Sequence, residues 1–497
     1  MDLSDPVTSA PSSYRHLLMN DLASHVHDSS DERHAARRAA LACMVTLAVA
    51  LGIGRFAFTP LLPLMLHGGA FGEPQIDIQH GGWLASFNYA GYFVGAVTCA
   101  ALRIAPARMV RVGLVATVLL TLAMGVTGQF WVWAAVRFSA GAVSAWTFVF
   151  ASQWGLRRLA EFGAHGWGGV IYTGPGVGIV GTGLLVSVAG GYGATAGWIG
   201  FGLIAAVLSV VVWPVFGAAS GGSARSASAR AADSGQHPTS RASHRAAAFW
   251  LVLLYGVPGF GYIITATFLP VIARHALPGS SWPDLFWPMF GAALIVGALL
   301  AARLPVHWDN RTLLAGCYVL QACGIALGIV WPTAGGFSLG SILIGLPFTA
   351  ITLFAMREAR RLRGDDAAGL MGYATAAYGV GQIVGPLVAA PIAEHTGSFS
   401  PALWLAAGAL LLGAAGLIVV AHLVRGRGRM PACGCSQARA EAAVLPIAAT
   451  EKQITRRHTK MTAFPLSQRA CRRARRQPCN ISRPTTTPAS VPKRSRR

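Results

Sequence analysis

Long uncharged runs of apolar residues alternate with short polar segments along most of the chain. A helix needs roughly 20 apolar residues to cross about 30 Å of hydrocarbon. Runs of that length predict twelve transmembrane helices, over residues 40–66, 82–104, 108–128, 130–154, 166–189, 194–217, 248–273, 284–303, 312–331, 335–356, 368–392 and 401–424. The hydrophobic pattern therefore predicts an all-α polytopic membrane protein.

Polar segments divide these helices into two groups of six. Residues 218–247 are rich in Ala, Ser, Gly and Arg, a composition typical of a flexible linker. The chain is thus predicted to have a polar N-terminal segment, two six-helix bundles with this linker between them, and a basic C-terminal tail. The corresponding ranges are 1–38, 39–217, 218–247, 248–424 and 425–497.

The arginines predict how the chain is oriented in the membrane, because basic loops face the cytoplasm. They recur in every second segment between the spans, as at Arg103, Arg108, Arg157, Arg158, Arg303, Arg311, Arg360 and Arg361. The alternate segments carry Glu73, Asp77, Asp284 and Glu394 but a single arginine, Arg274. We therefore expect both termini and the linker on the cytoplasmic side of a bacterial inner membrane.

Composition and charge narrow the class further. Of the 497 residues, 54% are hydrophobic and 12% are charged, about half the charged share of a soluble domain. The net charge of +22 is concentrated in residues 425–497, which hold 18 of the 40 Lys and Arg residues. The tail is predicted to be disordered, and a dispensable tail or a shifted reading frame is favoured over nucleic-acid binding.

The two halves of the chain are related by an internal repeat. Residues 51–56, Leu-Gly-Ile-Gly-Arg-Phe, align at an offset of 207 with residues 258–263, Pro-Gly-Phe-Gly-Tyr-Ile. Arg55 consequently occupies the position that Tyr262 occupies in the second half. Such a parallel six-plus-six repeat is found in secondary transporters.

Twelve spans, this repeat and an internal linker resemble the major facilitator superfamily over residues 40–424. In the fourth span, Arg137-x-x-x-Gly141 is similar to a motif of that superfamily. In the fifth, Gly174-Pro175-x-x-Gly178 is similar to a motif often found in exporters. The usual Gly-x-x-x-Asp-Arg loop motif between spans two and three lacks its Asp here, which leaves its gating role open.

A narrower resemblance lies in residues 52–63, Gly-Ile-Gly-Arg-Phe-Ala-Phe-Thr-Pro-Leu-Leu-Pro. This stretch resembles the opening helix of the YbfB/YjiJ-like branch of bacterial permeases. The two resemblances imply a monomeric secondary transporter that works by alternating access on a small-molecule substrate, with no cofactor. They imply neither import nor export.

Arg55 is the strongest candidate for a binding residue, since sixteen uncharged residues precede it and eleven follow it. An arginine at a helix centre costs about 2.5–3.5 kcal/mol on insertion scales, so it should face a cavity or a partner. One interpretation is a guanidinium that binds a substrate carboxylate. The other is a structural arginine bonded to carbonyls of a neighbouring helix.

Further polar residues could line the same cavity. Asn88 and Tyr92 are spaced i, i+4 on one predicted helix, as are Tyr378 and Gln382 on another, so each pair lies on one face. Tyr262 joins them through the repeat. These residues could bond substrate oxygens or, alternatively, neighbouring helices.

For Arg137 and Gly141 the sequence supports coupling and scaffold roles equally. Gly174, Pro175 and Gly178 are more typical of a helix-packing seam that permits bending.

All 18 acidic residues fall in loops, tails or span edges. A positive cavity without an acid favours a small organic anion, and this anion could also carry a proton. Efflux of a neutral or cationic drug or metabolite is the alternative, and a non-transporting sensor is a third. No span offers a catalytic acid pair, a metal cluster or an activated Ser, so no enzymatic activity and no metal are expected.

Overall fold

The computed structural model describes residues 32–67, 76–217, 238–305, 307–363 and 367–427, which lie within one compact unit, Met1–Arg429. Throughout these residues the chain is helical or irregular. Most of the predicted N-terminal segment 1–38, most of the linker 218–247 and nearly all of the tail 425–497 lie outside the described residues.

The first half contains six spans. The first runs from Glu32 to His67 and includes the π-helix η1 (Ala48–Ile53) and α2 (Phe58–His67). The others comprise α3 (Ile78–Thr98), η2 (Cys99–Ala101), α4 (Pro106–Val126), α5 (Phe130–Glu161), η3 (His165–Trp167), α6 (Gly168–Ile171), α7 (Gly174–Ala189), η4 (Gly190–Tyr192), α8 (Gly193–Val212) and η5 (Trp213–Phe216).

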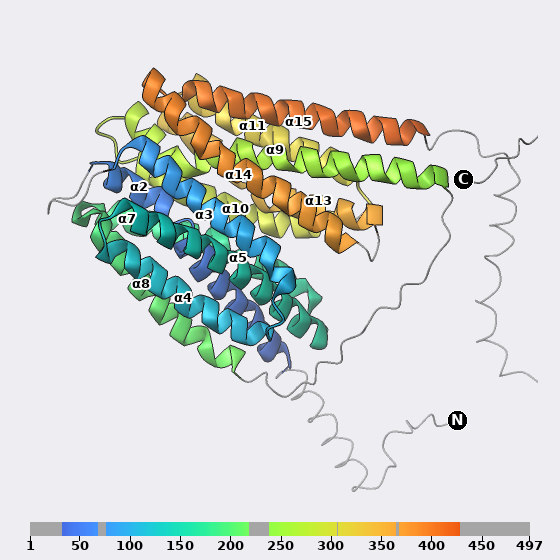
Figure 1. The fold of residues 1–497 in the computed structure, drawn as a ribbon, viewed down its shortest axis with the longest axis horizontal. Helices are drawn as coiled ribbons and strands as arrows, with labels where there is room; N and C mark the ends of the chain where they lie inside the picture. The colour runs from blue at the N-terminus through green and yellow to red at the C-terminus, as the bar shows by residue number, and fades with distance from the viewer. Residues whose placement is uncertain (1–31, 68–75, 218–237, 306, 364–366, 428–497) are drawn as a thin grey trace, which may run out of the picture. The chain divides into compact units, whose positions relative to one another are not determined.

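The second half also contains six spans, of which the fourth is made of two consecutive helices, α12 and α13. The helices are α9 (Pro238–Ala276), α10 (Pro283–Arg303), α11 (Asn310–Val330), α12 (Ala334–Gly345), α13 (Phe348–Arg363), α14 (Ala367–Thr396) and α15 (Ser400–Arg427). We call the end of the bundles where α8 leads into the linker and α9 leaves it the linker end, and the opposite end the far end (Figure 1).

The predicted fold class is confirmed. Eleven helical segments of the described chain are long and apolar enough to cross a membrane, and α3 adds a 21-residue helix between the first and second of them. Several helices extend past their predicted spans at the linker end, where α9 begins at Pro238 and α5 ends at Glu161. Hydropathy marks the part of a helix that lies in lipid, whereas backbone hydrogen bonds continue into water.

The two halves meet along three pairs of helices. Helix α3 packs against α14, α7 against α10, and α2 against α9, and Figure 1 shows the blue α3 beside the orange α14. The repeat exchanges the first two pairs, because α3 corresponds to α10 and α7 to α14, and the third pair joins the equivalent first and seventh spans. The residues that the sequence repeat aligned, Arg55 and Tyr262, therefore lie on facing helices.

At the far end, α3 begins at a helix cap. The Asp77 carboxylate accepts a hydrogen bond from the backbone N–H of His80 at 2.6 Å. Partial burial raises the pKa of Asp77, but hydrogen bonds from the backbone and ring of His80 outweigh burial and hold it below its ordinary value. A carboxylate in this position also stabilises the positive end of the helix dipole.

Glycines bring the first span close to α7. A Cβ atom on Gly178 would lie 2.6 Å from both Gly52 Cα and Ala48 O, and Gly174 faces Met44 O in the same seam. The second half repeats this arrangement, because Gly381 of α14 approaches the backbone of α9. This placement supports the packing interpretation of Gly174 and Gly178, next to which Pro175 is buried.

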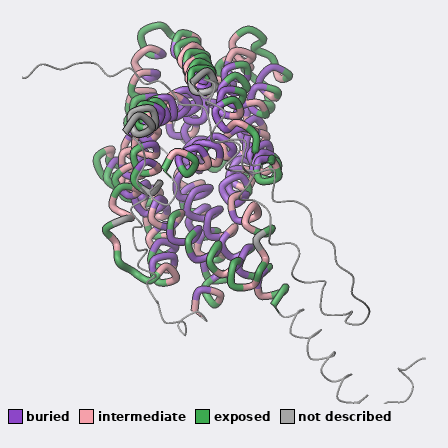
Figure 2. The backbone as a smooth tube through the Cα atoms, turned by 90° about the vertical axis from the view of Figure 1, so that its right-hand side faces the viewer, coloured by how far each residue is buried: buried purple, intermediate pink, exposed green. Residues whose placement is uncertain are grey.

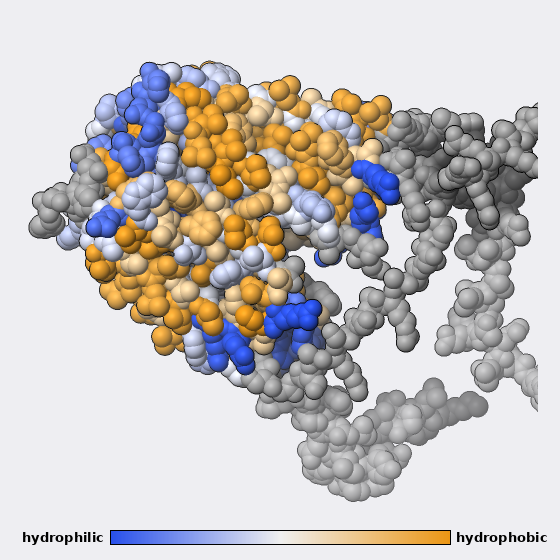
Figure 3. Space-filling model, viewed as in Figure 1, coloured by the Kyte–Doolittle hydropathy of each residue, from blue (hydrophilic) through white to orange (hydrophobic). Residues whose placement is uncertain are grey.

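The surface is that of a membrane protein. Buried residues gather along the interior faces of the helices, and exposed ones face outward (Figure 2). Hydrophobic residues cover most of the face drawn in Figure 3, and the most hydrophilic ones gather toward its two ends. Exposed residues of the lipid-facing helices include Val207, Val210 and Leu412. Such a surface suits hydrocarbon and not water.

The glycine seam predicts a difference between two neighbouring positions of α7. Gly178→Val should lower the stability by about 1–3 kcal/mol, because the new side chain meets backbone that cannot give way. Gly181 is the matched control, since nothing lies within 4 Å of a Cβ added there. Thermal unfolding of purified Gly178→Val and Gly181→Val measures the difference in stability. Equal melting temperatures would show that the seam does not hold the first span.

Candidate functional site

The first span is interrupted near its middle, next to Arg55. In the π-helix η1 the hydrogen bonds reach back five residues, so that Gly54 N–H donates to Val49 O and Phe56 N–H donates to Leu51 O, both at 2.9 Å. Such π-bulges are rare and are frequently found at functional sites. The interruption changes the helical register just before the guanidinium.

Arg137 of α5 binds the carbonyls that this interruption releases. Its Nη1 donates to Gly54 O at 3.3 Å and its Nη2 donates to Arg55 O at 3.1 Å. The N–H of Thr59 does not reach Arg55 O and donates to Phe56 O instead. Arg137 is 2% exposed. It thus acts on the backbone of the first span, which supports the scaffold interpretation over the coupling one.

Arg55 itself faces a ring of neutral groups at the contact between the halves. It is 5% exposed, and its Nη2 donates to Gln382 Oε1 of α14 at 2.9 Å. Its Cζ lies 3.9 Å from the ring centre of Tyr92, 5.1 Å from that of Tyr89 and 5.3 Å from that of Phe56. These distances are those of cation–π contacts.

A stack of tyrosines from the second half continues the site. The amide nitrogen of Gln382 donates to the Tyr262 hydroxyl. The Tyr262 ring is stacked with Tyr378 at 6.0 Å, and Tyr378 with Tyr255 at 5.1 Å. Tyr255 O–H donates to Thr352 Oγ1 at 3.1 Å. The site combines one buried cation, one amide and several ring faces.

The structure brings together five of the six predicted lining residues: Arg55, Tyr92, Tyr262, Tyr378 and Gln382. Asn88 lies elsewhere, fully buried, with its Nδ2 donating to Arg137 O at 2.8 Å.

Asn88 and Tyr92 share a face of α3 but are about 6 Å apart along its axis. Tyr92 consequently reaches Arg55, whereas Asn88 reaches α5. Gly141 belongs to the same contact between α3 and α5, because a Cβ added to it would meet the Asn88 backbone.

Tyr89 and Tyr255 also belong to the site, although they are not among the residues predicted from sequence. Tyr255 precedes Tyr262 by seven residues, two helical turns, so a search along the same face of α9 would have found it. Tyr89 gives no such signal, since it is one of many apolar or aromatic residues in α3. Its hydroxyl is hydrogen-bonded to Thr267 Oγ1 at 3.0 Å.

Hydrogen bonds cross between the halves at the level of Arg55 and toward the far end. Besides the contacts of Arg55 and Tyr89, Thr59 Oγ1 donates to Ala266 O at 2.8 Å and Ser86 Oγ donates to Ile383 O at 2.9 Å. Both hydroxyls lie nearer the far end than Arg55 does, judged by the direction of their helices. These bonds hold the halves together on that side of the site.

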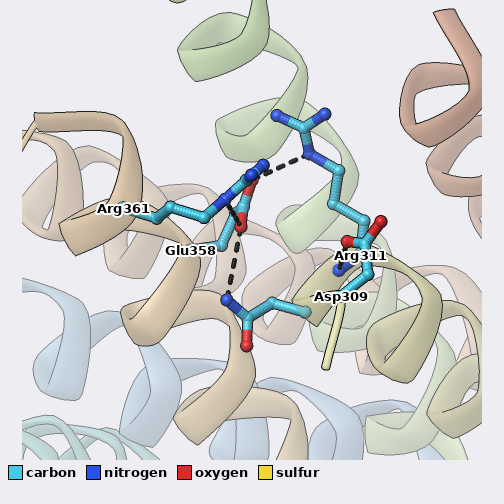
Figure 4. Close-up of polar contacts among 5 residues, drawn as sticks. Asp309, Arg311, Glu358 and Arg361 are labelled. Atoms are coloured by element: carbon cyan, nitrogen blue, oxygen red, sulfur yellow. Dashed lines mark hydrogen bonds and ion pairs between the residues drawn. The ribbon is translucent and has the colours of Figure 1, made fainter. Parts of the chain in front are cut away.

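A second charged cluster, at the linker end, contains a buried carboxylate, Glu358, that hydropathy places at the edge of a span. Glu358 lies two residues past the predicted span 335–356, yet it is 0% exposed. Arg311 Nε is 2.8 Å from its Oε1 and Arg361 Nη2 is 2.7 Å from the same atom. Asn310 donates to Oε2 at 3.3 Å. Figure 4 shows Arg311 and Arg361 in contact with Glu358. The cluster ties the start of α11 to α13.

Over the described residues, no three His, Cys, Asp or Glu side chains come close enough to hold a metal ion.

The family described as "Uncharacterised MFS-type transporter YbfB" matches residues 47–419. A mutant of the nucleoside transporter NupG has the same fold, with a TM-score of 0.60 and 14% identity over 77% of this chain and 99% of that one.

Relatives with higher identity match a shorter segment. Chloramphenicol efflux pumps from two strains of Mycobacterium tuberculosis are 30% identical over 174 residues, which is 33% of this chain and 41% of each relative. A chloramphenicol resistance protein of Streptomyces lividans is 32% identical over 174 residues, 32% of this chain and 38% of the relative. The chain thus spans about two fifths of the length of these relatives.

The Glu358 cluster predicts that two glutamates differ in their importance for folding. Glu358→Gln leaves Arg311 buried without its counter-charge, which should cost about 3–5 kcal/mol. Glu161→Gln is the control, because this glutamate has a 45% exposed side chain and pairs with Arg157 and Arg158 in water. The control should change the stability by less than about 1 kcal/mol. Thermal unfolding measures the stability of both variants. Similar losses of stability in the two would show that Glu358 is no more important for folding than Glu161.

Proposed function

The chain belongs to the family of MFS-type transporters represented by YbfB, and we propose that it carries a small organic anion across the bacterial inner membrane by alternating access. The family and the apolar helices make it a multi-pass membrane transporter. The observation that carries the anion proposal is the buried guanidinium of Arg55 at the contact between the halves, which has an amide and not a carboxylate as its hydrogen-bond partner.

Three arginines are buried in the described chain, and Arg55 differs from the other two in its partners. Arg311 is paired with the carboxylate of Glu358, and Arg137 bonds two backbone carbonyls. Arg55 contacts Gln382 and aromatic ring faces. Charge–charge interactions strengthen as the local dielectric falls. A substrate carboxylate would therefore supply the counter-charge that the described contacts of Arg55 do not include.

The surrounding rings suggest what the rest of the substrate resembles. Tyr92, Tyr262 and Tyr378 offer flat apolar faces and hydroxyl groups at the same site. A ring or other planar group would pack on those faces, and its oxygens would bond the hydroxyls. We therefore favour an anion with a planar, partly apolar body.

Efflux of a neutral drug is the second candidate, and the names of the chloramphenicol efflux and resistance proteins favour it. Chloramphenicol is an uncharged nitroaromatic compound that would use the ring faces more than the guanidinium. The Gly174-Pro175 motif is compatible with export under either candidate. Chloramphenicol therefore belongs in the binding experiment.

We propose a monomer with both termini and the linker in the cytoplasm, as the arginine-rich linker end suggests.

Any proton coupling would depend on a proton carried by the substrate, since the described contacts of Arg55 include no Asp, Glu or His.

The proposal predicts that carboxylates bind and that their amides do not. The purified protein would be tested by thermal shift and calorimetry with acetate, succinate, benzoate and salicylate, each beside its primary amide, and with chloramphenicol. Arg55→Lys should weaken carboxylate binding by about 1–2 kcal/mol, because a two-point contact becomes a single one. Arg55→Gln should weaken it further.

Arg111→Gln is the matched control, because Arg111 also lies over an aromatic ring, that of Trp213. Arg111 is at the linker end and does not contact the site. This variant should leave carboxylate binding unchanged. If the amides or chloramphenicol bind the parent protein and Arg55→Gln equally well, the anion proposal is wrong. A purely structural Arg55 would instead show binding that falls only as the folded fraction falls.

A further inference from the structure

Gln382 bridges the two halves of the transporter through a single side chain. It is 2% exposed, its Oε1 accepts from Arg55 of the first half, and its amide nitrogen donates to Tyr262 of the second. An amide can accept and donate at once, and both functions are used here. The chain Arg55–Gln382–Tyr262 is thus a hydrogen-bonded link across the contact between the halves.

The guanidinium at one end of this link has unused capacity. Arg55 Nε is buried and has no hydrogen-bond partner, although a guanidinium offers five N–H donors in a planar fork. An amide oxygen is a single neutral acceptor, whereas a carboxylate presents two charged oxygens that match the fork. A carboxylate would therefore bind Arg55 more strongly than the Gln382 amide does.

Resting on the proposed function, we propose that Gln382 Oε1 occupies the place of the substrate's carboxylate, so that the substrate binds by displacing it. Displacement breaks the bond between Arg55 and Gln382. The Gln382 side chain, which donates to Tyr262, is then no longer tied to the first half. Substrate binding and the separation of the halves at this level then become the same event. Gln382 acts as the residue that sets both affinity and coupling.

The surrounding contacts would pass this change toward the far end. Tyr89 lies over the Arg55 guanidinium and is hydrogen-bonded to Thr267 of the second half. Gln382 is followed by Ile383, whose carbonyl accepts from Ser86. A shift of either Arg55 or Gln382 therefore disturbs a neighbouring bond between the halves.

Two substitutions of Gln382 separate this proposal from a merely structural role. The probe is whichever of acetate, succinate, benzoate and salicylate binds the unsubstituted protein most tightly. Gln382→Leu removes the acceptor that competes with it for Arg55, so this variant should bind the probe at least 5-fold more tightly. Gln382→Glu supplies a permanent carboxylate, so the same probe should bind at least 10-fold more weakly at pH 7.5. In reconstituted vesicles, both variants should transport that carboxylate more slowly than the parent. Should Gln382→Glu fail to fold, the Gln382→Leu affinity decides.

Ser86→Ala is the control, because it removes a neighbouring bond between the halves without touching Arg55. It should change the affinity by less than 2-fold. Equal tightening in Ser86→Ala and Gln382→Leu would show a general loosening of the halves and overturn the proposal. So would an unchanged or weaker affinity in Gln382→Leu. If no carboxylate of the panel binds the parent, the proposed function itself fails, and this inference fails with it.

Discussion

The hydrogen bonds from the Arg137 guanidinium to the carbonyls of Gly54 and Arg55 are the interaction on which the site depends. A peptide carbonyl without a partner in the bilayer core costs several kcal/mol, so an interrupted span needs a donor at the interruption. The π-helix inserts in effect one residue, which turns the following side chains by roughly 100° about the axis. On either side of this point, Gly52 packs against Gly178 and Arg55 contacts Gln382 of the other half.

The internal repeat places two different residues, Arg55 and Tyr262, at equivalent positions of the two halves. The first span is interrupted, whereas α9 is a continuous helix. One half therefore supplies a cation with its backbone clamped, and the other supplies a phenol. Gln382 of α14 fills the space between them. Pseudo-symmetry places these residues opposite one another, and the difference in residue type gives the site its chemistry.

Much of this arrangement is predictable from sequence, because hydropathy defines the spans and the repeat aligns Arg55 with Tyr262. What spacing cannot give is the partner of a buried side chain on another helix. Asn88 has the right periodicity for the site but bonds α5, and Glu358 lies at a span edge yet is fully buried by two arginines. For Arg137 the sequence supports two roles, and only the position of the Gly54 carbonyl distinguishes them.

The most direct test is an experimental structure of the protein with the tightest-binding carboxylate of the panel. We expect the carboxylate oxygens to lie within hydrogen-bonding distance of the Arg55 guanidinium, with the Gln382 amide displaced from it. Arg137 should still bond the carbonyls of Gly54 and Arg55. A carboxylate bound elsewhere in the transporter, with the bond between Arg55 and Gln382 intact, would show that Arg55 is not the anion site.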